Sequence, residues 1–195
     1  MKHAVIFAHP VPQSFTGSVA SAYAKAVTGL GHSVLVRDLY GIGFDPCLKA
    51  RELPFASDFQ IAPDIAQERD LLKDCDVFAL VYPLWLNTLP AILKGYLERV
   101  FGFGFAYGAG GQSCNPLLNG RKLISFTSSG APAVWVKRTG ALQTQFDDYF
   151  AELCGMSVLD HVHVGAVTPG ASAYFIQARL EEVADIVNTH FRRPS

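Results

Sequence analysis

The chain has 195 residues, of which 50% are hydrophobic and 17% charged, and its formal net charge is −1. This length allows one domain over residues 1–195 with a large buried core, and the near-neutral charge excludes the basic surface typical of nucleic-acid-binding proteins. No apolar run approaches the roughly 20 residues that cross a bilayer, and no signal-peptide pattern opens the chain, so we expect a cytoplasmic protein without membrane insertion.

The first 40 residues predict a strand, a helix and a second strand. Residues 4–8 form a short apolar run that we expect to be a buried parallel strand, and residues 33–39 form the next one. Between them, Ser14 or Thr16 can cap a helix that ends near Gly29. This order is a βαβ unit, so the two strands should be parallel neighbours.

The middle of the chain holds an irregular segment followed by a strand, a turn and a helix. Residues 41–62 show no clean period and predict a long excursion with at most a short helix. A helix over 65–73 and a strand over 77–82 come next. The strand leads into an aromatic turn with a proline on each side, and the turn passes into a helix over 91–101. In open α/β sheets, a flat ligand binds at such a strand end.

The C-terminal half continues the same alternation. We predict a loop over 103–119, strands over 122–127 and 158–164, and helices over 142–153 and 173–191. Five strands that alternate with helices indicate an α/β fold, with a parallel sheet covered by helices on both faces. The fourth strand ends in a polar turn, Thr127-Ser128-Ser129-Gly130, which is typical of a binding loop.

The loops after the strands narrow the choice of ligand. A dinucleotide fingerprint would follow the first strand, but no glycine stands there before Gly17, and the chain contains no P-loop motif. Residues 9–16 suit a phosphate, whereas 83–87 and 127–130 suit a flat polar ring, so together they fit a flavin. Ser14 and Thr16 have ordinary helix capping as their alternative role.

A metal site is the other interpretation that the polar residues allow. His161 and His163 alternate along one strand and share a face, but no third ligand accompanies them, and the four cysteines form no C-x-x-C pair. We therefore predict no metal. Lys137 and Arg138 could meet the phosphate of NADPH or form a solvated basic pair.

Several motifs resemble the flavodoxin-like NAD(P)H:quinone reductases, the group that includes DT-diaphorase and the bacterial modulators of drug activity. The resemblance covers most of the chain, and its most specific part is Pro90-Ala91-Ile92-Leu93-Lys94-Gly95 after the Pro83-Leu84 turn. Further anchors are Ala8-His9-Pro10, Ser14-Phe15, Phe105-Ala106-Tyr107 and Cys154-Gly155. The resemblance implies a flavodoxin-like doubly wound sheet of order 2-1-3-4-5, and a homodimer with the site at its interface.

The resemblance also implies roles for individual residues. The phosphate and ribityl end of the flavin would be held by His9, Phe15 and Thr16. Ser14, which can cap the following helix, is also predicted to bind the cofactor. The ring would be lined by Pro83, Leu84, Trp85, Leu86 and Asn87, and its polar edge would be reached by Thr127, Ser128, Ser129 and Gly130. Tyr107 would be the catalytic residue, reaching the acceptor from the neighbouring subunit, or only an interface aromatic. No histidine lies between Gly130 and Gly155, so the proton-relaying histidine of DT-diaphorase has no counterpart there.

We therefore expect an enzyme, a flavin-dependent NAD(P)H:quinone oxidoreductase that transfers hydride in two ping-pong steps. The resemblance to DT-diaphorase implies FAD as the cofactor, with FMN possible, and residues 102–119 form a loop long enough to cover an adenosine. NADH or NADPH would be the donor, and a quinone, nitroaromatic or azo compound the acceptor. The alternative is a flavin-binding regulatory subunit of a membrane transporter, of the potassium-efflux ancillary type.

Overall fold

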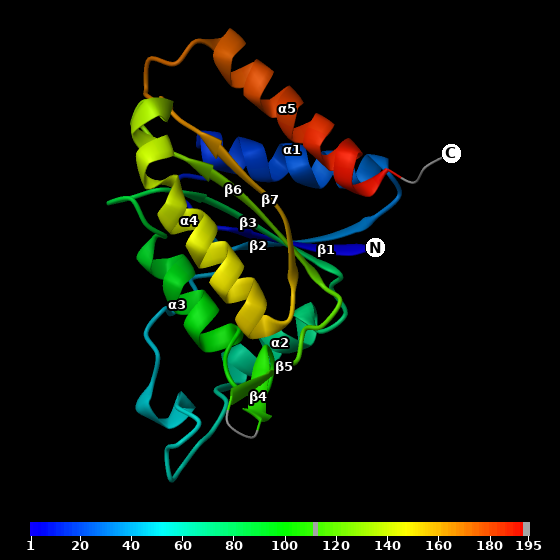
Figure 1. Ribbon diagram of the computed structural model, residues 1–195, viewed down its shortest axis with the longest axis vertical. Helices are drawn as coiled ribbons and strands as arrows, with labels where there is room; N and C mark the ends of the chain where they lie inside the picture. The colour runs from blue at the N-terminus through cyan, green and yellow to red at the C-terminus, as the bar shows by residue number, and fades with distance from the viewer. Residues whose placement is uncertain (111–112, 193–195) are drawn as a thin grey trace.

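A computed structural model describes residues 1–110 and 113–192, without the side chains of residues 113, 133 and 136–145. It contains a five-stranded parallel sheet with the order β2-β1-β3-β6-β7 (Figure 1). Counted within this sheet alone, that is the predicted order 2-1-3-4-5, and the fold prediction is confirmed. The sheet strands are β1 Lys2–Phe7, β2 Ser33–Asp38, β3 Val77–Pro83, β6 Lys122–Ser128 and β7 Ser157–Val164.

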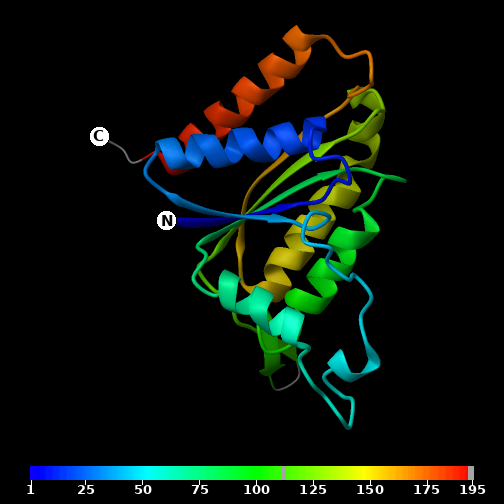
Figure 2. The same cartoon turned by 180° about the vertical axis from the view of Figure 1, so that it is seen from behind.

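Helices cover both faces of the sheet (Figure 1, Figure 2). α1 and α5 lie on one face, and α2, α3 and α4 lie on the other. The helices are α1 Phe15–Gly29, α2 Pro63–Leu72, α3 Ala91–Val100, α4 Ala133–Cys154 and α5 Ala173–Phe191. None of the described helices is both long enough and apolar enough to span a bilayer.

The central strand β3 shows why the sheet needs both layers. Every residue of β3 is buried, and alternate side chains enter opposite halves of the core. Phe78 and Leu80 pack in the half under α2, α3 and α4. Ala79 and Val81 pack in the half under α1 and α5. A strand that is buried on both faces reads as a continuous apolar run, which is the pattern that predicted it.

Two predicted elements differ from the structure. The predicted loop over 103–119 contains an antiparallel hairpin, β4 Tyr107–Gly110 with β5 Ser113–Pro116. Both strands are short and contain no β-branched residue, and β4 is glycine-rich, so the pattern that marks a strand is missing. α4 begins at Ala133, with Pro132 at its N-cap, well before the predicted start at 142. The predicted start was too late because the spacing of the apolar residues becomes regular only further along the helix. The other elements agree within two residues.

The excursion over residues 41–62 is attached to α3 by a buried ion pair. It contains only the short 3₁₀ helix Ala50–Glu52, as predicted. Arg99 of α3 donates to both Glu52 oxygens, at 2.9 and 2.7 Å, and to the Asp45 carbonyl at 2.5 Å. Burial disfavours the charged form of Glu52, but the hydrogen bonds from Arg99 and from the Lys49 N–H outweigh it and lower the pKa of this carboxyl.

The half of the core under α1 contains a buried histidine. His3 is fully buried, with Nδ1 2.8 Å from the Tyr23 hydroxyl and Nε2 2.9 Å from His32 Nδ1. Burial, followed by the nearby charge of His32, lowers the pKa of His3 from 6.5 to about 4. At pH values between these two, the unfolded chain therefore binds a proton that the folded chain does not.

We expect this histidine to make the fold sensitive to acid. Its contribution is fully present above pH 6.5 and is lost as the pH falls towards 4, so this histidine by itself should lower the free energy of unfolding by about 2 kcal/mol between pH 7 and pH 5. Urea unfolding at both pH values would measure the drop. His3→Gln should make the measured drop smaller by about this amount, whereas His190→Gln should not. Equal drops in wild type and His3→Gln would contradict the assignment.

Candidate functional site

A cavity of about 170 Å³ lies at the carboxyl edge of the sheet. The loops that form it follow β1, β3 and β6, which are neighbours in the sheet, so their ends meet at one edge. A fourth loop, after β7, adds Val167, which carried no signal in the sequence. The lining residues are His9, Ser14, Phe15, Thr16, Pro83, Leu84, Trp85, Ser128, Ser129, Gly130 and Val167. The structure thus brings together all the predicted cofactor-binding residues except Leu86, Asn87 and Thr127.

The first loop presents N–H donors to the cavity. Ser14 caps α1 by accepting the Gly17 N–H at 3.1 Å. The N–H groups of Phe15 and Thr16 find no acceptor among the described residues, as expected in the first turn of a helix. His9 Nδ1 lies 3.0 Å from the Val11 nitrogen and 3.1 Å from the Val11 carbonyl oxygen, so Val11 holds the ring in place through this nitrogen. These donors, with the positive end of the helix dipole, favour an anion.

The second loop is a tight turn in a strained conformation. Trp85 and Thr88 exchange backbone hydrogen bonds of 3.1 Å, and Leu86 and Asn87 between them have φ of 51° and 62°. This is the geometry of a type I′ turn, which normally uses glycine or asparagine. A leucine there costs about 1–2 kcal/mol, and such strain is concentrated at functional sites. Leu86 is fully exposed, and the Trp85 ring lies 5.7 Å from the His9 ring.

Leu86 and Asn87 line a second cavity, of about 380 Å³, beside the first one. Leu84 borders both cavities. The other lining residues are Tyr82, Thr88, Leu89 and Phe146. The predicted ring-binding loop therefore contributes to two adjoining cavities, one polar and one mainly apolar.

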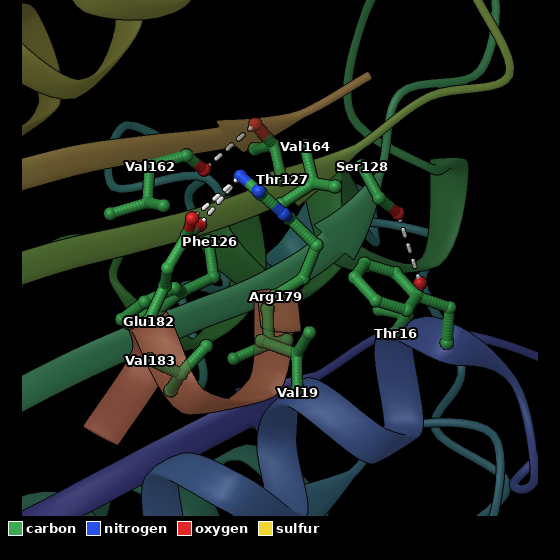
Figure 3. Close-up of a pocket in the computed structure, with 12 residues that line it drawn as sticks. Thr16, Val19, Phe126, Thr127, Ser128, Val162, Val164, Arg179, Glu182 and Val183 are labelled. Atoms are coloured by element: carbon green, nitrogen blue, oxygen red, sulfur yellow. Dashed lines mark hydrogen bonds and ion pairs between the residues drawn. The ribbon is translucent and has the colours of Figure 1, made fainter. Parts of the chain in front are cut away.

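Backbone hydrogen bonds attach the third loop to its neighbours. The Leu84 N–H donates to the Ser128 carbonyl at 2.7 Å, and the Val167 N–H donates to the Ser129 carbonyl at 2.9 Å. Ser128 Oγ lies 3.3 Å from Thr16 Oγ1. Figure 3 shows this hydroxyl pair between α1 and the sheet, beside a small cavity that Arg179 of α5 also lines. Both residues of the pair line this small cavity and the larger one.

Thr127 is turned away from the cavity and meets two histidines. It is 3% exposed, and its Oγ1 lies 2.8 Å from His163 Nδ1. His163 Nε2 lies 3.1 Å from Ser129 Oγ, and His161 Nδ1 lies 2.5 Å from Asp147 Oδ2. Burial, followed by the charge of His161, lowers the pKa of His163 to about 4.

The sequence placed the two histidines on one face but suggested only a metal for them. No group of three or more potential metal ligands occurs within residues 1–110 and 113–192. Their partners Thr127 and Asp147 lie on other elements, so no local pattern could reveal the contact. The side chains of Lys137 and Arg138 lie outside the described part of the structure.

Tyr107 lies at the other end of the fold. It stands on the β4–β5 hairpin, which follows the C-terminal end of α3 (Figure 1). The aromatic turn of the cavity instead comes before the N-terminal end of α3. Its ring is 6.4 Å from that of Phe103, and it lines a separate cavity with Arg69 and Glu52. Burial is the main cause of its raised pKa. Within one chain, the predicted catalytic tyrosine is thus not near the predicted flavin-binding residues.

The fold and this edge site define the class of protein. A family model described as flavodoxin-like fold matches residues 1–187, so the chain belongs to that family. The chain is 40% identical over 132 residues to a Haemophilus influenzae protein named uncharacterized NAD(P)H oxidoreductase, covering 67% of this chain and 65% of that protein. It is 31% identical over 149 residues to NAD(P)H dehydrogenase [quinone] 1 of Cavia porcellus, covering 67% and 54%. The matches thus span less than two thirds of these curated relatives.

Among solved structures, the chain is similar to an NAD(P)H:quinone oxidoreductase from Methanothermobacter marburgensis. The identity is 25% and the TM-score 0.78, and the match covers 95% of this chain and 96% of that one. This likeness extends over nearly the whole length of both chains.

Proposed function

We propose that this chain is a flavin-dependent NAD(P)H:quinone oxidoreductase with its flavin at the carboxyl edge of the sheet. The observation that carries the proposal is one continuous edge at which an anion-binding helix N-terminus, a strained turn and a serine-rich loop meet. The names of the Haemophilus and Cavia relatives support an NAD(P)H-dependent activity. Nothing in the described residues or among these relatives favours the alternative, a regulatory subunit of a transporter.

The donor groups fit the two ends of a flavin. The free N–H groups of Phe15 and Thr16, with the ring of His9, would hold the phosphate. The N–H groups of Leu86 and Asn87 also have no acceptor among the described residues, and they would face the oxygens and nitrogens of the ring's polar edge. The apolar walls of the second cavity suit the rest of the ring system.

A bound flavin would supply the hydride chemistry. The residues of the chain would orient its ring, keep water from it and stabilise negative charge at its polar edge through fixed N–H donors. NAD(P)H and then the acceptor would occupy the same open side in turn, which is ping-pong behaviour. A quinone is the proposed acceptor, and nitroaromatic and azo compounds are further candidates.

Two finer points of the proposal are the role of Tyr107 and the choice between FAD and FMN. Because Tyr107 lies away from the cavity in its own chain, it could serve as the catalytic residue only in a homodimer in which it reaches the other subunit's site. The hairpin also removes one reason for preferring FAD, since none of the described residues between 102 and 119 lines this cavity. We retain FAD as the proposed cofactor on the resemblance alone, with FMN as the second candidate.

The direct test is to purify the protein and record its visible spectrum. We expect flavin absorption near one equivalent per chain, and chromatography of the released cofactor distinguishes FAD from FMN. Assays with NADH and NADPH and the quinone menadione should give parallel double-reciprocal lines. A colourless protein that takes up neither flavin would overturn the proposal, and a monomer in sedimentation analysis would overturn the role of Tyr107.

A further inference from the structure

A row of five polar side chains leads from α4 across the edge of the sheet to the cavity. His161 Nδ1 is 2.5 Å from Asp147 Oδ2, and His161 Nε2 is 3.4 Å from Thr127 Oγ1. Thr127 Oγ1 is 2.8 Å from His163 Nδ1, and His163 Nε2 is 3.1 Å from Ser129 Oγ. We call these five residues the histidine row. Its last member, Ser129, lines the cavity, and the others do not.

The row results from strand pairing. β6 and β7 are parallel neighbours in which Thr127 pairs with His163. Since alternate residues of a strand share a face, His161 also points towards Thr127. α4 covers this face and supplies Asp147, which is 1% exposed. The row therefore connects three elements, with Asp147 and Thr127 buried and the other members half-buried.

The buried carboxylate favours a positive charge at its end of the row. Asp147 Oδ1 has no hydrogen-bond partner among the described residues, and its Oδ2 contacts only an imidazole nitrogen. An unpaired buried carboxylate is costly, so a protonated His161 would balance it. The side chain of His161 is 14% exposed, so it is partly open to solvent, as His163 and Ser129 also are. It can therefore be reloaded with a proton from water.

The Thr127 hydroxyl can also donate to the Val162 carbonyl, at 3.3 Å. When it donates to a histidine instead, two patterns of hydrogen bonding fit these distances, and they differ by one proton. In the first, His161 is protonated on both nitrogens and donates to Asp147 and Thr127. Thr127 then donates to His163, which donates through Nε2 to Ser129. In the second, His161 keeps only its Nδ1 proton and accepts from Thr127. His163 then donates through Nδ1 to Thr127 and accepts from Ser129 through Nε2.

We propose that the histidine row stores one proton and delivers it through Ser129 to the reduced acceptor in the cavity. The proposal rests on the proposed quinone reductase activity, whose chemistry needs one such proton. NAD(P)H gives up a hydride, which carries two electrons, and is oxidised to NAD(P)⁺. A quinone that gains this hydride becomes a hydroquinone anion, and one further proton completes the hydroquinone.

The delivery step balances atom by atom. The Ser129 O–H bond breaks as an O–H bond forms on the acceptor. Ser129 takes the Nε2 proton of His163, and His163 takes the Thr127 hydroxyl proton on Nδ1. Thr127 takes the Nε2 proton of His161, which becomes neutral. Ser129 touches the acceptor, whereas the other members of the row act through it and are positioning residues.

The charges around the row are consistent with this direction. His163 stays neutral in both patterns, in keeping with the burial that lowers its pKa to about 4. Tyr82 of β3 is buried near Asp147, and burial and then this carboxylate raise its pKa, so it stays protonated. Asp160 of β7 is engaged by the His161 N–H at 2.8 Å and by His190 of α5 at 3.4 Å.

The first test uses the protein without flavin and needs no activity. Nitrogen NMR of the imidazole rings reports which nitrogen of each histidine carries a proton. We expect Thr127→Val to change the protonation pattern of His161 and His163 together, and Ser129→Ala to change that of His163. His190→Gln, which alters a histidine outside the row, should change neither. Two histidines that titrate independently and ignore Thr127→Val would overturn the row.

The second test measures the two half-reactions of flavin-loaded protein. Glutamine can keep hydrogen bonds to Thr127 and Ser129 but cannot pass a proton. We therefore expect His163→Gln to slow the reaction with quinone by about 100-fold, to raise its solvent isotope effect and to make it fall with rising pH, while reduction by NAD(P)H is unchanged. His190→Gln should match wild type in both steps.

The outcomes separate the two proposals. If His163→Gln reacts with quinone at the wild-type rate and with the wild-type isotope effect, the delivery step is overturned and the quinone reductase activity stands. If the wild-type protein takes up no flavin, the proposed function and the delivery step both fail. Thermal melting of each variant shows whether a slower reaction reflects a damaged fold.

Discussion

Arg99→Met is expected to lower the free energy of unfolding by about 3–5 kcal/mol, because it leaves a buried carboxylate without its partner. The side chains of Arg99 and Glu52 are 2% and 5% exposed. The guanidinium also contacts Asp64 at 3.1 Å and the Asp45 carbonyl, and it lies 5.5 Å from the Phe44 ring. Urea denaturation would measure the loss.

The same helix offers a matched control. Lys94 pairs with Glu98 in an exposed i,i+4 geometry, with side chains 51% and 44% exposed. Lys94→Met should therefore change the free energy of unfolding by less than about 1 kcal/mol. Adding Glu52→Leu to Arg99→Met should recover part of the lost stability, because no buried charge then remains. If Arg99→Met lowered the free energy of unfolding by less than about 1 kcal/mol, the Arg99–Glu52 pair would not be what attaches residues 41–62 to α3.

Gly17→Ala is expected to weaken flavin binding by about 100-fold. A Cβ at this position would lie 2.1 Å from the Pro12 carbonyl oxygen and 3.3 Å from the Phe7 ring. Because the oxygen belongs to the backbone, the loop between His9 and Ser14 must move. Losing two charge-assisted hydrogen bonds to a phosphate costs about 3 kcal/mol, and this energy corresponds to a loss in affinity of about 100-fold. Titration of the apo-protein with flavin, followed by fluorescence, would measure it.

Gly29 provides the control on the same helix. A Cβ there meets nothing within 4 Å, so Gly29→Ala should raise stability by up to about 1 kcal/mol through helix propensity and leave flavin binding unchanged. In Gly17→Ala the same propensity gain opposes an overpacking cost of about 1–3 kcal/mol. Wild-type flavin affinity in Gly17→Ala would mean that the first loop does not hold the phosphate.

The cavity could be predicted well because its parts are local signals at strand ends. Apolar runs located the strands, and polar or aromatic turns followed directly after β1, β3 and β6. Parallel strands end at a common edge, so adjacency in the sheet was enough to bring His9, Trp85 and Ser129 together. The N-cap role of Ser14 was also readable, since it depends on residues within one turn.

Side-chain direction at the strand ends could not be read in the same way. Thr127 and Ser128 were both expected at the flavin, yet β6 extends to Ser128 and the period of two sends their hydroxyls to opposite faces. A one-residue difference in where a strand ends reverses which side chain enters the cavity. Tyr107 likewise has a recognisable motif but a position away from the cavity.

The sequence by itself determined the alternation of strands and helices, the α/β class, the capped helix after β1 and the absence of a glycine fingerprint there. Tertiary structure alone decided which distant polar groups meet. Arg99 and Glu52 are 47 residues apart, and Thr127 and His163 are 36 apart. Such pairs leave no local pattern, because each partner is placed by its own element. Their meeting depends on strand register and helix packing, which only the folded chain establishes.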